Sequence, residues 1–188
     1  VSCDITIRIG APQFEIGSVA TSYIPTPLNS TASRQADVFT IPTASWFNAS
    51  EGTLTTQALN GTNAATVGIA SLDSSANSTS ERITLIRIAT TSLESLVRNT
   101  AATQFQTSMV SGGDNTLNKT GLGYKLNNFR QATNNALSSL DSSGTLPSGV
   151  DRLRLGVWGG SAFYDGWIQK LKYYPVRTSD TQLQLLTQ

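Results

Sequence analysis

The residues best suited to chemistry lie in the stretch Arg152 to Tyr174, which contains two of the three tryptophans. Trp158 follows Arg154 on one side of an alternating pattern, and Leu153 and Leu155 occupy the other side. If the leucines face the core, Trp158 and Arg154 point outward or into a groove. An aromatic face can stack on a sugar ring, and amides or charged groups can bind the sugar hydroxyls.

Further polar side chains are expected beside this aromatic residue. Tyr164 and Asp165 follow in the next loop, and Lys125 and Asn127 alternate away from their apolar neighbours. We therefore predict a glycan-binding site formed by Trp158, Arg154, Tyr164, Asp165, Asn127 and Lys125. The alternative is that Trp158 and Trp167 belong to the core or an interface, as large aromatic residues mostly do.

Catalytic groups are scarce. The sequence has no histidine, which removes the usual general base and any Ser–His–Asp triad. No two acidic residues lie within four positions of each other, whereas glycan hydrolases need a pair of carboxylates. We predict that the protein is not an enzyme, and an enzyme acting on a polysaccharide is the third option, behind glycan binding and a purely structural role.

A metal site receives little support from the sequence. Asp73, Asp114 and Asp165 lie in stretches that read as loops, where a carboxylate and backbone carbonyls can hold Ca²⁺. None of them is surrounded by further oxygen ligands, and Asp in turns mostly caps the backbone. We predict no cofactor and no metal.

The charge balance excludes two classes of partner. Thirteen Lys and Arg face twelve Asp and Glu, for a net charge of +1, which favours neither nucleic acid nor an anionic membrane. Charged residues make up 13% of the chain, against about 25% in an average domain. A single cysteine excludes an intrachain disulfide, so stability has to come from the core and the backbone hydrogen bonds.

Many short alternating stretches separated by turn signals predict a β-sandwich. The stretch Arg152 to Tyr174 reads as a hairpin of two strands. Ser92 to Asn99 is compatible with a helical turn, but the Thr-rich stretch after it favours a strand that continues to Met109. Residues 136–150 read as a long polar loop. Ser179 and Gln182 form a capping box that predicts a short terminal helix.

Residues 1–27 look different, with an alternating stretch at Ile5 to Ile9 and then Pro25 and Pro27. The segment EIGSVATSYIPT, followed by RQADV, resembles a junction in bacteriophage tail proteins, where one module ends in a strand and another begins. The segments SWFNASEGTLTTQAL, ERITLIRI, GLGYKLNNF, DRLRLGVWGG and GWIQKLKYYPVRTSDTQLQLLT resemble a concanavalin A-like (laminin G-like) jelly roll.

The resemblance implies a fold and a setting. Residues 1–27 would end a preceding module, and residues 28–188 would form an all-β, antiparallel concanavalin A-like jelly roll with a short C-terminal helix. It further implies a module of a phage tail fibre or tail tip in the virion, as a homo-oligomer, a trimer, among other virion subunits. Its expected partner is a host cell-surface polysaccharide, and the alternative is a structural or decoration domain that makes protein–protein contacts.

Overall fold

The computed structural model describes residues 23, 25–28, 30–32, 38–62 and 65–188, and the chain divides into two units, Val1–Asp37 and Val38–Gln188. The strand predicted at Ile5 to Ile9 falls outside the described residues. The boundary after residue 27 therefore stays a prediction.

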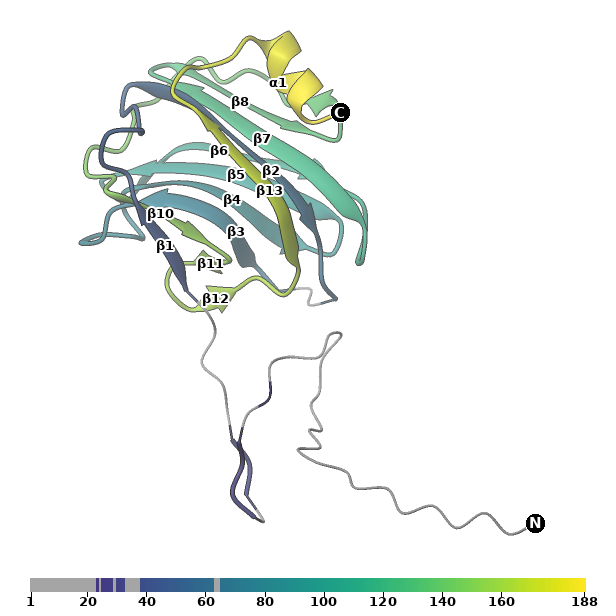
Figure 1. Ribbon diagram of the computed structural model, residues 1–188. Coiled ribbons are helices and arrows are strands. Elements are labelled where there is room, and N and C mark those ends of the chain that lie inside the picture. Colours follow the sequence, from purple (N-terminus) through teal and green to yellow (C-terminus); the bar gives the residue numbers. More distant parts are fainter. Residues whose placement is uncertain (1–22, 24, 29, 33–37, 63–64) are drawn as a thin grey trace. The chain divides into compact units, whose positions relative to one another are not determined.

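Two antiparallel sheets pack face to face in this unit (Figure 1). One sheet has six strands, in the order β1 (Phe39–Pro42), β10 (Arg152–Leu155), β3 (Val67–Asp73), β4 (Arg82–Ala89), β5 (Ser92–Asn99) and β6 (Ala102–Val110). The other has five, in the order β13 (Trp167–Tyr174), β2 (Glu51–Leu59), β7 (Leu117–Lys125), β8 (Asn128–Thr133) and β9 (Ala136–Leu137). A small two-stranded ribbon contains β11 (Val157–Trp158) and β12 (Ala162–Phe163).

The core lies between the two sheets and follows the period of two in the strands. Leu85 of β4 and Leu122 of β7 are fully buried in it, and Phe105 of β6 stacks on Phe129 of β8 with ring centroids 5.6 Å apart. Because alternate residues point inward, the residues between them form the outer faces of the sheets. Those outer faces are where a ligand can bind.

The short helix α1 (Asp180–Leu186) ends the chain and packs against the five-stranded sheet (Figure 1). The Ser179 hydroxyl accepts from the Gln182 amide, and the Gln182 side chain accepts from the Ser179 amide, so the predicted capping box is present. Leu183 is fully buried. None of the helices in the described part of the chain is long and apolar enough to cross a membrane.

Two details of the predicted strands are wrong. The stretch Arg152 to Tyr174 is not a hairpin, because β10 and β13 belong to different sheets. Gly156, with a φ of +71°, ends β10 and redirects the chain into the ribbon β11–β12 before β13 begins. The stretch Ser92 to Met109 forms two strands, because Thr100 and Ala101 both adopt positive φ in a tight turn between β5 and β6.

The predicted fold class is confirmed. The unit is an all-β antiparallel sandwich with one short C-terminal helix in its described part. The predicted loop over residues 136–150 contains the two-residue strand β9 and no other strand of the described chain. Asn134 and Asn135 both adopt positive φ in the tight turn between β8 and β9, where asparagine tolerates it.

Candidate functional site

A row of charged side chains crosses four strands on the outer face of the six-stranded sheet. The strand register places Arg152 opposite Asp73, Asp73 opposite Arg82, and Arg82 opposite Arg98. Like charges directly opposite each other on a sheet destabilise it. The pair Arg82–Arg98 is therefore an unfavourable arrangement that the fold tolerates at this position.

Asp73 neutralises two other arginines in the same region. Its fully buried carboxylate accepts from Arg152 Nε at 2.8 Å and from Arg154 Nε at 2.8 Å and Nη2 at 2.5 Å. The Ser71 hydroxyl donates to the same carboxylate at 2.7 Å. The acceptor capacity of Asp73 is thus occupied, and little of it is left for Arg82.

Arg82 lies beneath Trp158. Its guanidinium carbon is 5.0 Å from the centroid of the indole ring, within the range of a cation–π contact. The buried Nε of Arg82 has no hydrogen-bond partner among the described residues. Burial, with a further contribution from Arg98, lowers the pKa of Arg82 to about 10. The environment of this guanidinium is therefore electropositive and incompletely compensated.

Gly68 explains how Trp158 comes to lie on this face. A Cβ atom at Gly68 would be 2.4 Å from the Val157 carbonyl carbon and 2.5 Å from the Trp158 amide nitrogen. The absence of a side chain lets β11 lie directly against β3. Trp158 then extends over β4 from this position.

Next to Trp158 the outer face is hollowed, with a volume of about 410 Å³, within the range of small-molecule sites. The hollow is lined by Thr66, Ile86, Ile88, Glu94, Leu96, Arg98, Thr103, Gln106 and Trp158. It combines an apolar floor, an aromatic wall and a polar rim.

Hydrogen bonds fix the polar rim of this hollow. Glu94 Oε2 accepts from Gln106 Nε2 at 2.9 Å and from the Ser108 hydroxyl at 3.1 Å. Arg98 donates through Nη1 to the Thr79 carbonyl at 3.2 Å and through Nη2 to the Ala101 carbonyl. Amide, hydroxyl, carboxylate and guanidinium groups are thus held beside apolar surface, which suits a ligand with hydroxyl groups and a hydrophobic face.

The structure brings together only part of the predicted site. Trp158 lines the hollow, and Arg154 lies on the same sheet but is 5% exposed and engaged with Asp73. Tyr164 is partly buried, donates its hydroxyl to Asn60 Oδ1 at 3.0 Å, and has its pKa raised by burial. Asp165 Oδ1 lies 3.7 Å from Nη1 of the buried Arg87. These contacts give Tyr164 and Asp165 structural roles at another position.

Lys125 and Asn127 lie away from the hollow, at the turn between β7 and β8 of the five-stranded sheet. Lys125 Nζ is 3.7 Å from Glu51 Oε2. Asn127 has a φ of +55°, and its side-chain oxygen accepts from the Gly144 amide at 3.1 Å. Neither residue is brought near Trp158, so the predicted six-residue set does not form one site.

Sequence reasoning missed most residues of the hollow, which come from β4, β5 and β6. Arg82, Thr84, Ile86 and Ile88 alternate in the sequence with Ile83 and Leu85. This alternation is the sequence signal that could have located the site, because it places Arg82, Thr84, Ile86 and Ile88 on the outer face of the sheet. The contribution of Gln106 and Ser108 was hidden by reading β5 and β6 as one strand.

The three aspartates considered for Ca²⁺ have other partners. Asp73 binds Arg152 and Arg154, and Asp114 Oδ1 lies 2.5 Å from Arg87 Nη2. Asp165 also lies beside Arg87. Over residues 38–62 and 65–188 and the few described before them, no three His, Cys, Asp or Glu side chains are placed to hold a metal ion.

Neither a protein-family model nor a curated protein matches this sequence. Solved structures do match its fold. The carbohydrate-binding module CBM40 of the Ruminococcus gnavus IT-sialidase, bound to α2,3-sialyllactose, has a TM-score of 0.63 at 15% identity, over 74% of this chain and 83% of that one. The leech intramolecular trans-sialidase has a TM-score of 0.62 at 17% identity, over 74% of this chain and 23% of that one.

A heptameric SAP-like pentraxin from Limulus polyphemus also matches, with a TM-score of 0.57 at 11% identity over 71% of this chain and 68% of that one. At these identities the comparisons establish the fold alone. The fold is the concanavalin-like jelly roll, as the resemblance implied. The phage setting is not addressed by these matches and stays a prediction.

Proposed function

We propose that the protein is a non-catalytic glycan-binding module whose site is the hollow on the outer face of the six-stranded sheet. The observation that carries the proposal is the combination, in one hollow, of Trp158, an apolar floor at Leu96 and the polar groups of Glu94 and Gln106. The match to a sialyllactose-bound carbohydrate-binding module supports the same function.

The charge distribution favours an acidic glycan. Arg82 and Arg98 face each other beside the hollow, Glu94 is the one carboxylate among its described lining residues, and Asp73 is already shared by Arg152 and Arg154. A ligand carboxylate would compensate this excess of positive charge. Sialyllactose, which the R. gnavus module binds, carries such a group and is the first ligand to test.

Catalysis is not part of the proposal. Glu94 is the one carboxylate among the described residues that line the hollow, whereas glycoside hydrolysis usually needs two. The sialidase chains that match do so over about a quarter of their length; for the leech enzyme the share is 23%. These partial matches therefore support a binding module.

We place this module in a phage tail fibre or tail tip, as a receptor-binding domain for host-surface glycan. The support is the resemblance of EIGSVATSYIPT and of the jelly-roll segments to phage tail proteins. A shallow site binds one glycan weakly, and several copies on a fibre would raise the avidity. A structural domain of the virion, held by protein–protein contacts, is the competing role.

The test is titration of the full chain with 3′-sialyllactose and with lactose, followed by binding to whole cells. Trp158→Ala and Gln106→Ala remove a wall and a rim residue, and Gln106 is exposed enough that its loss should leave folding intact. Leu126→Ala, at the turn between β7 and β8 of the other sheet and 57% exposed, is the control. Circular dichroism checks the fold of each variant.

We expect binding of sialyllactose that Trp158→Ala and Gln106→Ala each weaken by about tenfold or more, and that Leu126→Ala leaves unchanged. Equal binding of lactose would support the glycan site but would contradict the proposed preference for an acidic glycan. No binding to glycans or cells, even by a multivalent display of the chain, would overturn the proposal in favour of the structural role.

A further inference from the structure

The outer face of the five-stranded sheet carries a second set of ordered side chains, unrelated to the hollow above. The register of β13, β2 and β7 defines three rows across these strands: Trp167, Leu59 and Leu117; then Lys170, Gln57 and Lys119; then Lys172, Thr55 and Gly121. Rows two residues apart on a strand are separated by about 7 Å. An apolar row therefore lies directly beside the first of two rows that contain lysines.

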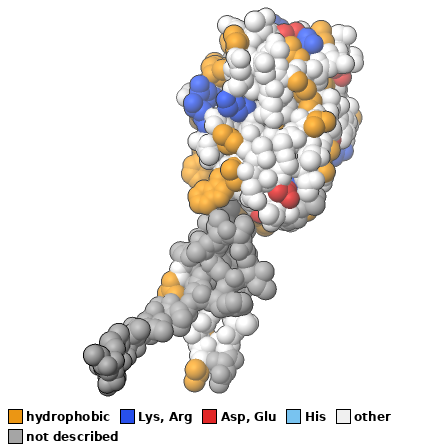
Figure 2. Space-filling view, turned by 90° about the vertical axis from the view of Figure 1, so that its right-hand side faces the viewer, with side chains coloured by type: hydrophobic (Ala, Val, Ile, Leu, Met, Phe, Trp, Pro, Cys, Tyr) orange, Lys and Arg blue, Asp and Glu red, His pale blue; other side chains and the backbone are white. Residues whose placement is uncertain are grey.

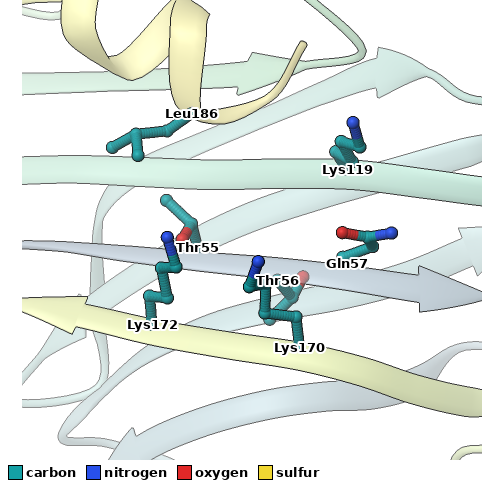
Figure 3. Close-up of a pocket in the computed structure, with 7 residues that line it drawn as sticks. All are labelled: Thr55, Thr56, Gln57, Lys119, Lys170, Lys172 and Leu186. Carbon is teal, nitrogen blue, oxygen red and sulfur yellow. The ribbon is translucent and has the colours of Figure 1, made fainter.

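The two basic rows enclose a small hollow of about 130 Å³ (Figure 3). It is lined by Thr55, Thr56, Gln57, Lys119, Lys170, Lys172 and Leu186. In Figure 3, Lys170 and Lys172 extend from β13 toward β2, while Lys119 lies across β2 on the neighbouring strand. Three lysines thus line one polar depression.

Among the described residues, no Asp or Glu side chain forms an ion pair with Lys119, Lys170 or Lys172. Within the described part of the chain, the lysine that forms an ion pair is Lys125, with Glu51, and it lies outside the hollow. Lys119 Nζ donates to the main-chain oxygen of Gln188. Lys170 and Lys172 are exposed. The depression is therefore a local concentration of positive charge on a protein whose net charge is +1.

The apolar row gives this basic site a second property. Trp167 is 59% exposed and Leu117 is 38% exposed, so an aromatic face is open to solvent one row away from Lys170. Figure 2 shows Lys and Arg side chains gathered close to a larger group of hydrophobic ones on the surface of this unit. An exposed aromatic ring next to a cationic depression matches a ligand that alternates sugar rings with anionic groups.

We propose that this face is a second binding site, which holds the phosphate or sulfate group of an anionic polysaccharide among Lys119, Lys170 and Lys172 while a neighbouring sugar ring stacks on Trp167. A tetrahedral oxyanion accepts several hydrogen bonds at once and can be shared by the three ammonium groups and the Thr55 hydroxyl. Each exposed contact is weak, and a polymer with repeated anionic groups compensates by avidity.

Nucleic acid is the competing polyanion, and the structure favours it less. Duplex binding uses an extended basic surface with many phosphate contacts, whereas this site has three lysines in one depression. The adjoining row is apolar, so it adds no further phosphate contact. We therefore propose a polysaccharide as the ligand, and duplex DNA serves as the competing ligand in the test.

The experiment measures binding of the full chain to dextran sulfate, to phosphorylated dextran and to uncharged dextran at low salt. The main variant is Lys170→Gln with Lys172→Gln. The control is Lys125→Gln, because Lys125 is an exposed lysine on the same sheet that lies outside the hollow. Trp167→Ala is examined separately. Comparing the two charged dextrans distinguishes a sulfate from a phosphate ligand.

We expect binding to at least one charged dextran and none to uncharged dextran, with affinity that falls as salt is added. The double lysine variant should lose about tenfold in affinity and Lys125→Gln less than about twofold. Trp167→Ala should weaken binding without changing its salt dependence.

Equal losses in the double variant and in Lys125→Gln would overturn the proposal, because they would indicate diffuse charge attraction. Tighter binding to duplex DNA than to either charged dextran would also overturn it. Trp158→Ala should leave polyanion binding intact. The proposals for this site and for the hollow on the six-stranded sheet can therefore be supported or contradicted independently.

Discussion

At the scale of single residues, the charge of Asp73 compensates two arginines on the outer face of the six-stranded sheet. The carboxylate is fully buried and accepts three hydrogen bonds from two arginines. Without it, Arg152 and Arg154 would join Arg82 and Arg98 as uncompensated cations. A buried charge that loses its partner destabilises a fold strongly, because the remaining ion is neither solvated nor paired.

Asp73→Asn is therefore expected to lower the free energy of unfolding by about 3–5 kcal/mol. Urea unfolding monitored by tryptophan fluorescence measures the change. Asp151→Asn is the control, since that carboxylate is exposed and accepts from Ser75. It should change the free energy by about 0.5 kcal/mol or less. An Asp73→Asn variant as stable as the wild type would contradict this account of the arginine cluster.

At the scale of elements, the position of β11 over β3 decides whether Trp158 reaches the hollow. Gly68→Ala would place a methyl group 2.4 Å from the Val157 backbone, and backbone cannot move aside as a flexible side chain can. We expect a loss of about 1–3 kcal/mol in stability, as for other overpacked sites. We also expect altered Trp158 fluorescence and a loss of glycan binding.

Gly113→Ala is the matched control for that prediction. A Cβ atom at Gly113 meets nothing within 4 Å, so the same chemical change should be tolerated. If Gly68→Ala kept its full affinity for the glycan, the placement of Trp158 by β11 would not be needed for binding.

The packing of α1 on the five-stranded sheet is expected to depend on pH through Asp180. Asp180 accepts from Arg130 Nη1 at 2.5 Å and from Arg177 Nη2 at 2.7 Å. Partial burial acts to raise the pKa of Asp180, but the hydrogen bonds from these arginines outweigh it, and the pKa is lowered. A lowered pKa in the folded state means that the charged form stabilises the fold.

That stabilisation is complete above the ordinary Asp pKa of about 3.9 and is lost as the pH falls through the lower folded value. Asp180→Asn should therefore be less stable than the wild type at about pH 6, and the difference should shrink at about pH 3. Urea midpoints at the two pH values measure it. A difference that does not change with pH would show that the carboxylate charge is not what holds α1.

How far the sequence predicts the structure also depends on the elements. The period of two in Arg82 to Ala89 and the capping box at Ser179 are local signals, and the sandwich and the terminal helix follow from them. The separation of β10 from β13 depends on the positive φ of Gly156, which a sequence with several glycines nearby does not single out. The site was also missed, because its residues are brought together by the register across β4, β5 and β6 and not by a local pattern in the sequence.

At the scale of the whole molecule, the two proposed sites lie on the outer faces of opposite sheets, separated by the core. The sheets of a sandwich are about 10 Å apart, and the core between them is closely packed. Of the residues that the structure describes, none lines both hollows. Sites that share no partner are expected to act independently.

A variant that combines Gln106→Ala with Lys170→Gln and Lys172→Gln should therefore show additive effects. Its affinity for sialyllactose should equal that of Gln106→Ala alone, and its affinity for charged dextran should equal that of the double lysine variant. Titration of each ligand in the presence of the other measures any coupling. A change above about twofold in either constant would indicate that the sheets communicate.

The alternation along β6 has an evolutionary consequence. Phe105 is buried in the core, while its neighbours Gln106 and Ser108 reach the polar rim on the opposite side of the same strand. Mutations at the exposed positions alter what the rim can recognise and leave the packing that folds the domain untouched. A lineage that meets a changing surface can therefore explore new specificities through single substitutions, without passing through unfolded intermediates.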